Sequence, residues 1–141
     1  MRKLAAILGI LVIALVAILS ISALNPSAQV NAELSEPFTL KIGQSAVLQS
    51  ENIRVTVWNV TEDSRCPTGV ECIWAGQVGG LVHIEKEGRN LGDFNLISNQ
   101  EKSTAIFDGY KIELVEVEPY PIYGKKIEVK DYLVRLIIYR N

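Results

Sequence analysis

Two cysteines, Cys66 and Cys72, are the residues of this 141-residue chain whose chemistry is easiest to define from their spacing. Their C-x5-C separation is not the C-x2-4-C separation of zinc sites, and the sequence has no redox-active C-x-x-C pair. In an oxidising compartment two such cysteines usually pair. We therefore predict a structural disulfide that closes a short loop, in which Pro67 and Gly69 allow the chain to turn back.

Carboxylates and one histidine are the candidates for catalysis or metal binding. By strand alternation His83 shares a polar face with Glu85, and no G-x-S-x-G nucleophile motif accompanies it. Glu62, Asp63 and Glu71 carry oxygen ligands that suit calcium, although the EF-hand pattern is absent. We predict no catalytic residue, no metal site and no cofactor. The alternative is a small extracytoplasmic hydrolase, or a calcium- or sugar-binding accessory.

One sequence motif is a candidate for modification. Asn59-Val60-Thr61 matches the acceptor rule for N-glycosylation, at the end of a predicted strand. Asn59 is therefore a candidate glycosylation site in a host that glycosylates exported proteins.

Aromatic residues gather around the cysteine loop and in a second irregular stretch. Trp58 and Trp74 flank the cysteines, and Tyr120 and Tyr123 lie in the later stretch. Exposed Trp and Tyr near loops often mark contact surfaces. A tryptophan can also close a core over a disulfide, as in many β-sandwiches. We expect the two tryptophans to be buried over the disulfide, with an exposed contact surface as the alternative.

The elements that must position these residues are β-strands. After residue 32 the chain is rich in Val, Ile and Thr, and Gly and Pro recur at short intervals. This pattern predicts an all-β fold, an antiparallel β-sandwich that is immunoglobulin-like or similar. The stretches 62–80 and 119–130 are irregular, and loops on a rigid scaffold often carry function. The expected strands are 38–42, 46–49, 53–60, 81–86, 91–97, 104–107, 110–118 and 132–139.

Two of these strands have features of their own. In 110–118 the apolar positions change phase after Leu114, which one extra residue in a β-bulge would cause. The strand 132–139 is apolar on both faces, so we expect it at the centre of a sheet.

The segment before the strands predicts export. Arg2 and Lys3 precede an uncharged apolar run over 4–21, which is the layout of a secretory signal. Residues 30–32, Val-Asn-Ala, fit the small-x-small exit site of a cleaved signal peptide. The run is also close to the minimum length of a membrane-spanning helix. Both interpretations place the rest of the chain outside the membrane.

The length and charge of the chain limit the number of domains and the classes of partner. We divide the chain into 1–32, a hydrophobic helix that is a signal peptide or an uncleaved anchor, and 33–141, one β-sandwich domain. The domain holds every acidic residue, and its formal charge of −4 argues against binding of nucleic acid. We expect contact with a membrane only through the N-terminal segment.

The region around the cysteines resembles a motif of small exported proteins and lipoproteins of prokaryotes. It is D-S-R-C-P-x-x-V-x-C-x-W-A-G over residues 63–76, and positions 119–121 and 131–132 are similar to a later part of the same family. The resemblance implies export and brings with it no activity, cofactor or catalytic residue. The acylated cysteine of the lipoprotein members is absent here, which leaves cleavage or a helical anchor.

Three motif residues, Asp63, Arg65 and Trp74, are candidates for binding or for shaping the loop. A charge-assisted hydrogen bond between Asp63 and Arg65, or a backbone N–H donating to Asp63, would hold the loop entry. Trp74 would then lie against the sulfur atoms, and Gly76 would supply a turn or a bulge that leads into the next strand. We predict a non-enzymatic exported domain that binds an unidentified protein or envelope component. A protease inhibitor presenting the disulfide-pinned loop is a further alternative.

Overall fold

The computed structural model describes residues 29–98 and 103–141, which form two β-sheets. The expected N-terminal hydrophobic helix lies outside the described residues. Within the described ranges, no helix is both long and apolar enough to cross a bilayer.

Short strands separated by tight turns account for most of the described chain. Its helical elements include two single-turn 3-10 helices, η1 (Gln49–Glu51) and η3 (Val129–Asp131). The all-β prediction is therefore confirmed. The strands are β1 (Val30–Asn31), β2 (Phe38–Lys41), β3 (Ser45–Leu48), β4 (Ile53–Asp63), β5 (Val78–Lys86), β6 (Arg89–Ile97), β7 (Thr104–Phe107), β8 (Tyr110–Glu118) and β9 (Leu133–Arg140).

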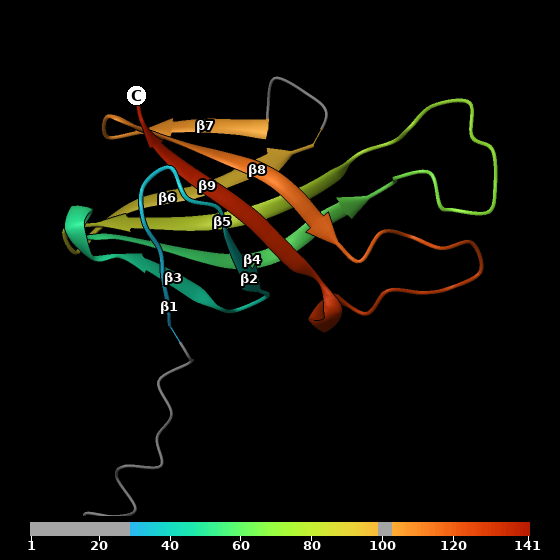
Figure 1. Cartoon of the computed structure of the whole chain (residues 1–141), viewed down its shortest axis with the longest axis horizontal. Helices are drawn as coiled ribbons and strands as arrows, with labels where there is room; N and C mark the ends of the chain where they lie inside the picture. The colour runs from blue at the N-terminus through green and yellow to red at the C-terminus, as the bar shows by residue number, and fades with distance from the viewer. Residues whose placement is uncertain (1–28, 99–102) are drawn as a thin grey trace, which may run out of the picture.

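The strands divide into two sheets (Figure 1). One sheet has the order β1-β3-β4-β5-β6, and the other has the order β2-β9-β8-β7. Neighbouring strands are antiparallel, except that β1 runs parallel to β3. The first sheet is largely a meander, because β3 to β6 are neighbours in the order in which they occur along the chain.

The two sheets share one hydrophobic core, because each strand directs alternate side chains inward. In β4, Ile53, Val55 and Val57 are fully buried, whereas the residues between them are partly exposed. The opposite sheet contributes the same pattern from β2, β8 and β9. Members of this core from both sheets are Leu40, Leu48, Val82, Ile84, Leu96, Ile112, Leu114, Val134, Leu136 and Ile138.

Two expectations about individual strands are confirmed. The pairing of β8 with β9 shifts between Leu114 and Glu116, so Val115 is the extra residue that the phase change predicts. Strand β9 lies between β2 and β8 and is central in its sheet, as its apolar sequence predicts.

The hairpin of β4 and β5 extends further than the sequence predicts. We expected strands at 53–60 and 81–86, but the ladder continues to the pair Asp63 and Val78. Two register shifts, after Val57 and after Val60, interrupt the alternation in β4. The sequence pattern fails at these bulges because each one moves the following side chains to the other face of the sheet.

Strand β1 is an element that the sequence did not indicate. Val30 and Asn31 pair with β3, and the backbone N–H of Ala32 donates to Val47 at 3.1 Å. The side chain of Ala32 belongs to the buried core. The residues of the expected cleavage site, 30–32, are thus part of the folded domain. The domain therefore includes residues that precede its expected start at residue 33.

Candidate functional site

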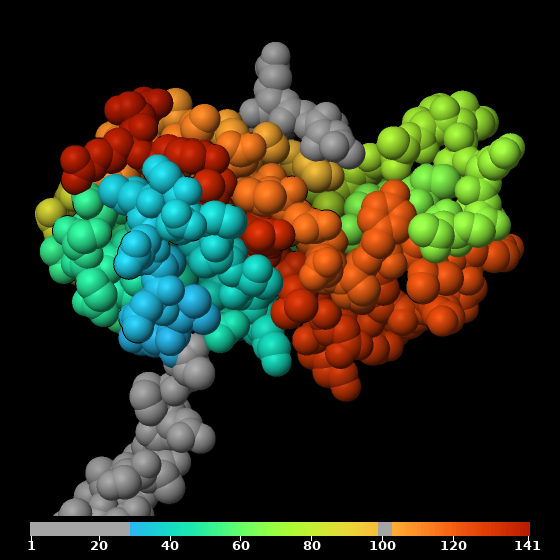
Figure 2. Space-filling view, viewed as in Figure 1, coloured from blue at the N-terminus to red at the C-terminus, as the bar shows by residue number. Residues whose placement is uncertain are grey.

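Two long connections project beyond the sheets at the same end of the molecule (Figure 1). One comprises residues 64–77, which join β4 to β5, and the other comprises residues 119–132, which join β8 to β9. Figure 2 shows the two connections against each other at this end. We call this region the two-loop end.

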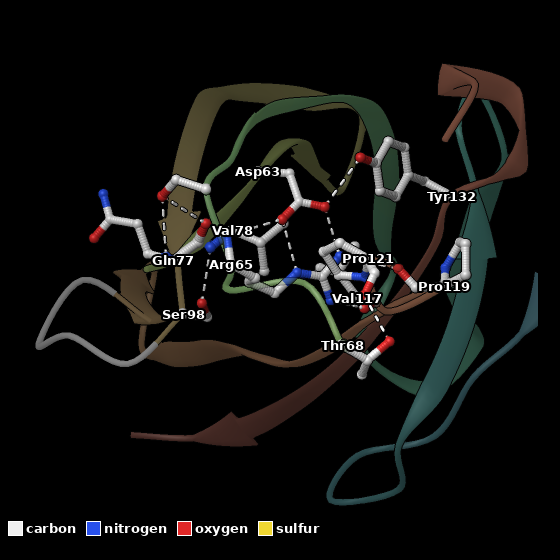
Figure 3. A network of polar contacts seen from close by, with 11 residues as sticks. Asp63, Arg65, Thr68, Gln77, Val78, Ser98, Val117, Pro119, Pro121 and Tyr132 are labelled. Carbon is white, nitrogen blue, oxygen red and sulfur yellow. Dashed lines mark hydrogen bonds and ion pairs between the residues drawn. The ribbon is translucent and has the colours of Figure 1, made fainter. Parts of the chain in front are cut away.

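A buried arginine, Arg65, forms hydrogen bonds where the two connections leave the sheets. Arg65 is 8% exposed, and among the described residues it is the buried charged side chain. Its guanidinium donates to both carboxylate oxygens of Asp63, at 2.8 and 2.6 Å. It also donates to the carbonyl oxygens of Val117 at 2.5 Å and Pro119 at 3.0 Å (Figure 3). The expected bond between Asp63 and Arg65 is present, and it extends into a link between β4 and the end of β8.

Asp63 receives further donors that complete this network. The backbone N–H of Arg65 donates to its Oδ1 at 3.3 Å, and the hydroxyl of Tyr132 donates to its Oδ2 at 3.0 Å. Burial raises the pKa of the Asp63 carboxyl, but the hydrogen bonds and charge of Arg65 lower it by more, so the net pKa lies below its usual value. Burial, followed by the adjacent carboxylate, raises the pKa of Tyr132. Asp63 is therefore held ionised and Tyr132 protonated at neutral pH.

Backbone contacts join the two connections directly. The N–H of Thr68 donates to the carbonyl oxygen of Pro121 at 2.9 Å, and the N–H of Tyr123 donates to that of Thr68 at 3.0 Å. Together they form a short parallel bridge between Thr68 and Ile122. The two connections therefore form one supported surface rather than two independent loops.

The disulfide between Cys66 and Cys72 is present at the tip of the first connection, as predicted. Below it the hairpin continues through backbone bonds from Ser64 to Gln77 and from Cys66 to Ala75, both at 2.8 Å. Gly76 has φ of +70° here, and a Cβ atom on it would lie 1.8 Å from the carbonyl oxygen of Ser64. No turn is assigned to Gly76 itself, but the close approach of the backbone requires glycine at this position.

The expectation that both tryptophans are buried over the disulfide is wrong. Trp74 is 76% exposed and Trp58 is 52% exposed. Trp58 lies instead on β4, where its ring meets His83 edge-on at 5.8 Å between centroids. Neither tryptophan belongs to the buried core that the two sheets share. The alternative, an exposed contact surface, fits the position of Trp74.

Large apolar side chains are exposed over both connections of the two-loop end. Ile73, between Cys72 and Trp74, is 93% exposed, and the sequence analysis did not single it out. An isoleucine between turn residues, with no strand of its own, is the signal that would have found it. The exposed apolar residues of this end are Val70, Ile73, Trp74, Tyr120, Ile122, Tyr123 and Val129.

A shallow groove runs along the second connection. Its volume is about 230 Å³. Lysine side chains and one carboxylate lie at its margin, and Lys126 forms an ion pair with Glu128 at 3.3 Å. The groove is lined by Pro119, Tyr120, Ile122, Lys125, Lys126, Ile127 and Asp131.

Most candidates for catalysis and metal binding are engaged in other contacts, whereas Glu71 is exposed on the first connection. His83 Nδ1 lies 2.6 Å from Asp93 Oδ1, away from the two-loop end. Glu62 accepts a hydrogen bond from Gln77 at 2.9 Å, while Asp63 is bonded to Arg65. Within residues 29–98 and 103–141, no group of three or more His, Cys, Asp or Glu side chains is placed to hold a metal ion.

Asn59 is exposed on β4, next to the first register shift of that strand. Thr61, the third residue of its acceptor motif, donates a hydrogen bond to Asn95 at 2.9 Å. The asparagine of the candidate glycosylation site is therefore accessible on the folded domain.

No protein-family model matches the chain, and no curated protein and no solved structure matches it either.

Proposed function

We propose that the chain is a non-enzymatic binding module at the cell envelope, and that it contacts its partner through the two-loop end. One observation carries this proposal: Ile73 and Trp74 are 93% and 76% exposed on a connection that is tied to the sheets. Soluble proteins rarely expose large apolar groups together unless the surface is used for interaction. Tryptophan and tyrosine are also enriched at the centres of binding interfaces.

The support beneath this surface favours binding over a passive loop. The Arg65 network, the disulfide and the bridge between Thr68 and Ile122 fix both connections before any partner arrives. Ordering flexible loops during association costs free energy, and a preorganised surface avoids most of that cost. The motif residues Asp63 and Arg65 thus act as supports, whereas Trp74 belongs to the contact surface.

The location of the module remains the expectation drawn from the sequence. The basic residues before the apolar run, and the resemblance to exported proteins and lipoproteins, support export with the domain outside the membrane. We also infer a β-sandwich, because the two sheets share one core. Four consecutive strands as neighbours in one sheet differ from the strand order of immunoglobulin domains, so the fold belongs to the similar rather than the immunoglobulin-like type.

The alternative functions receive less support from the described residues. A hydrolase would need His83 beside a nucleophile in a cleft, yet its contacts are Asp93 and Trp58 on a sheet surface. A protease inhibitor presents an extended loop with a free backbone, but Thr68, inside the disulfide loop, is bonded on both sides to the second connection.

Site-directed photo-crosslinking tests the proposal in the cells that make the protein. A photo-reactive amino acid replaces Ile73 in the full chain, and the matched control carries it at Ile106, an exposed apolar position of β7. We expect a discrete adduct from position 73 and none from position 106. Equal labelling at the two positions, or no adduct at position 73, would contradict the proposal.

A further inference from the structure

The most exposed apolar residues of the two-loop end lie on its first connection. Ile73 and Trp74 follow Cys72 there and are 93% and 76% exposed. The second connection adds Tyr120 and Tyr123, joined to the first through Thr68. Both connections belong to the end that protrudes in Figure 2, and the groove that Tyr120 lines on the second connection is shallow. Such a shape fits insertion into a soft, deformable surface.

The residue types match the polar–apolar boundary of a lipid bilayer. Tryptophan and tyrosine concentrate at this boundary, because each combines an apolar ring with one polar group. Isoleucine adds apolar area, and lysines favour the headgroups of anionic lipids. Lys125 and Lys126 lie beside the aromatic residues on the second connection.

The charge balance of this end also differs from that of the domain. The two connections, 64–77 and 119–132, carry three lysines and three carboxylates besides the buried Arg65, whose charge is paired with Asp63. The rest of the domain therefore accounts for its whole negative charge. The two-loop end is therefore the part of the domain that an anionic lipid surface would repel least.

The distance between the apolar run and the first strand limits how far the domain can leave a membrane. If the run over 4–21 is retained as an anchor, eight residues lead from Ser22 to Gln29, and they span about 28 Å at most when fully extended. Val30 lies level with Val55 across β3. Strand β4 advances by about 27 Å from Val55 to its end at Asp63.

The maximum span of residues 22–29 is similar to the advance of β4 from Val55 to Asp63. The two-loop end can therefore contact the bilayer when the strands are inclined to the membrane plane. The anchor would also keep that end close to the surface at all times. A contact that is weak on its own then becomes highly populated, because the encounter is intramolecular.

We propose that the partner of the two-loop end is the lipid bilayer surface, into which Ile73, Trp74 and the neighbouring tyrosines insert. This inference rests on the proposed function and names the chemistry of its partner. It replaces the expectation that only the N-terminal segment contacts a membrane. The insertion would be shallow, roughly 5–10 Å into the boundary between headgroups and acyl chains, because the charged residues Glu71 and Lys126 belong to the same end.

Fluorescence quenching by brominated lipids tests this inference on the full chain. The chain has two tryptophans, so Trp58→Phe leaves Trp74 as the reporter and Trp74→Phe leaves Trp58. Each variant is reconstituted in lipid nanodiscs of phosphatidylcholine, alone or mixed with phosphatidylglycerol, with bromine on the acyl chains. We expect loss of most of the Trp74 emission and a blue shift, with the Trp58 emission unchanged.

A second pair of variants separates insertion from mere proximity. In the Trp58→Phe background, Ile73→Ser should reduce the quenching of Trp74, whereas Ile106→Ser on β7 should not. Greater quenching with phosphatidylglycerol than without it would show that the lysines contribute. The inference is overturned if Trp74 is quenched no more than Trp58, or if Ile73→Ser has no effect.

The crosslinking and quenching experiments together distinguish failure of the lipid inference from failure of the proposed binding function. A protein adduct from the photo-reactive group at position 73, together with unquenched Trp74, would leave the binding module standing and replace the lipid surface by a protein partner. A lipid adduct together with quenched Trp74 supports both.

Discussion

Arg65 lies where the β4–β5 hairpin leaves the sheets and where β8 ends, and it bonds to both. Removing its guanidinium would leave the Asp63 carboxylate without its ion pair, and the carbonyl oxygens of Val117 and Pro119 without these donors. Loss of one partner of a buried ion pair is strongly unfavourable, because the remaining charge stays away from water.

We therefore expect Arg65→Ala to lower the free energy of unfolding by about 3 kcal/mol, measured by urea denaturation. Arg135→Ala is the matched control, since Arg135 forms an exposed pair with Glu116 at 3.8 Å. Exposed pairs contribute about 1 kcal/mol or less. Equal losses in the two variants would show that the buried network does not support the fold.

The same network predicts a dependence of stability on pH. The pKa of Asp63 is lower in the folded chain than its ordinary value, about 3.9, in an unfolded chain. The unfolded chain thus binds the proton more readily, so this carboxyl stabilises the fold above about pH 4 and ceases to do so as the pH falls through its folded-state pKa.

Asp63→Asn should make stability less sensitive to acid, measured as the change in urea midpoint from neutral pH to about pH 3. The slope against pH is the readout, because the substitution also lowers stability at every pH. Part of the sensitivity should persist, since the hydrogen bond from Tyr110 lowers the pKa of Glu51 as well. An unchanged slope would show that Asp63 titrates normally.

At this scale the sequence predicted local contacts and missed distant ones. Asp63 and Arg65 are two positions apart, so their bond follows from the residue types alone. The bonds of Arg65 to Val117 and Pro119 span more than fifty positions and depend on how the sheets pack. Trp74 was expected to be buried because a tryptophan covers the disulfide in many β-sandwiches, but the residue type alone does not decide burial.

Among the elements, the β4–β5 hairpin depends on one glycine. Gly76 combines φ of +70° with a backbone approach that leaves no space for a Cβ atom. Gly124 has a similar φ of +74°, but nothing lies within 4 Å of where its Cβ would be. Comparing alanine substitutions at Gly76 and Gly124 therefore separates the cost of a positive φ from the cost of a steric clash.

Gly124→Ala should cost about 1 kcal/mol, which is the strain of a positive φ. Gly76→Ala should cost clearly more, about 3 kcal/mol, because the hairpin must also move apart at Ser64. Thermal unfolding of both variants provides the comparison. If the two losses are equal, the hairpin at this point is more adaptable than its geometry indicates.

The strands were predictable where the alternation was regular and were misjudged where it was not. The bulge in β8 showed as a phase change, and β9 showed as a strand apolar on both faces. The ends of β4 and β5 were missed because register shifts and paired glycines resemble a loop. Strand β1 was missed because two residues carry no period.

For the whole molecule, the disulfide and the core are separate sources of stability. Neither Cys66 nor Cys72 belongs to the buried cluster that joins the sheets. The covalent link closes a loop of only seven residues, so it should stabilise the chain by roughly 2.4 kcal/mol through the entropy of the unfolded state.

The double variant Cys66→Ala, Cys72→Ala should therefore keep the far-ultraviolet circular dichroism spectrum of both sheets. Amide exchange should become faster in residues 64–77 but not in β8 or β9. Loss of the sheet signal would mean that the loop directs folding of the whole domain, which its position outside the core contradicts.

The pairing of β1 with β3 has a consequence for the maturation of the protein. A protease that cuts after Ala32 must reach an extended chain, yet in the folded domain that residue is buried and its backbone is bonded to Val47. Cleavage at this bond therefore competes with folding in time. A chain that folds first keeps its N-terminal segment, and a chain that is cut first folds without its edge strand. The relative speed of the two events would decide whether the domain is released or stays attached.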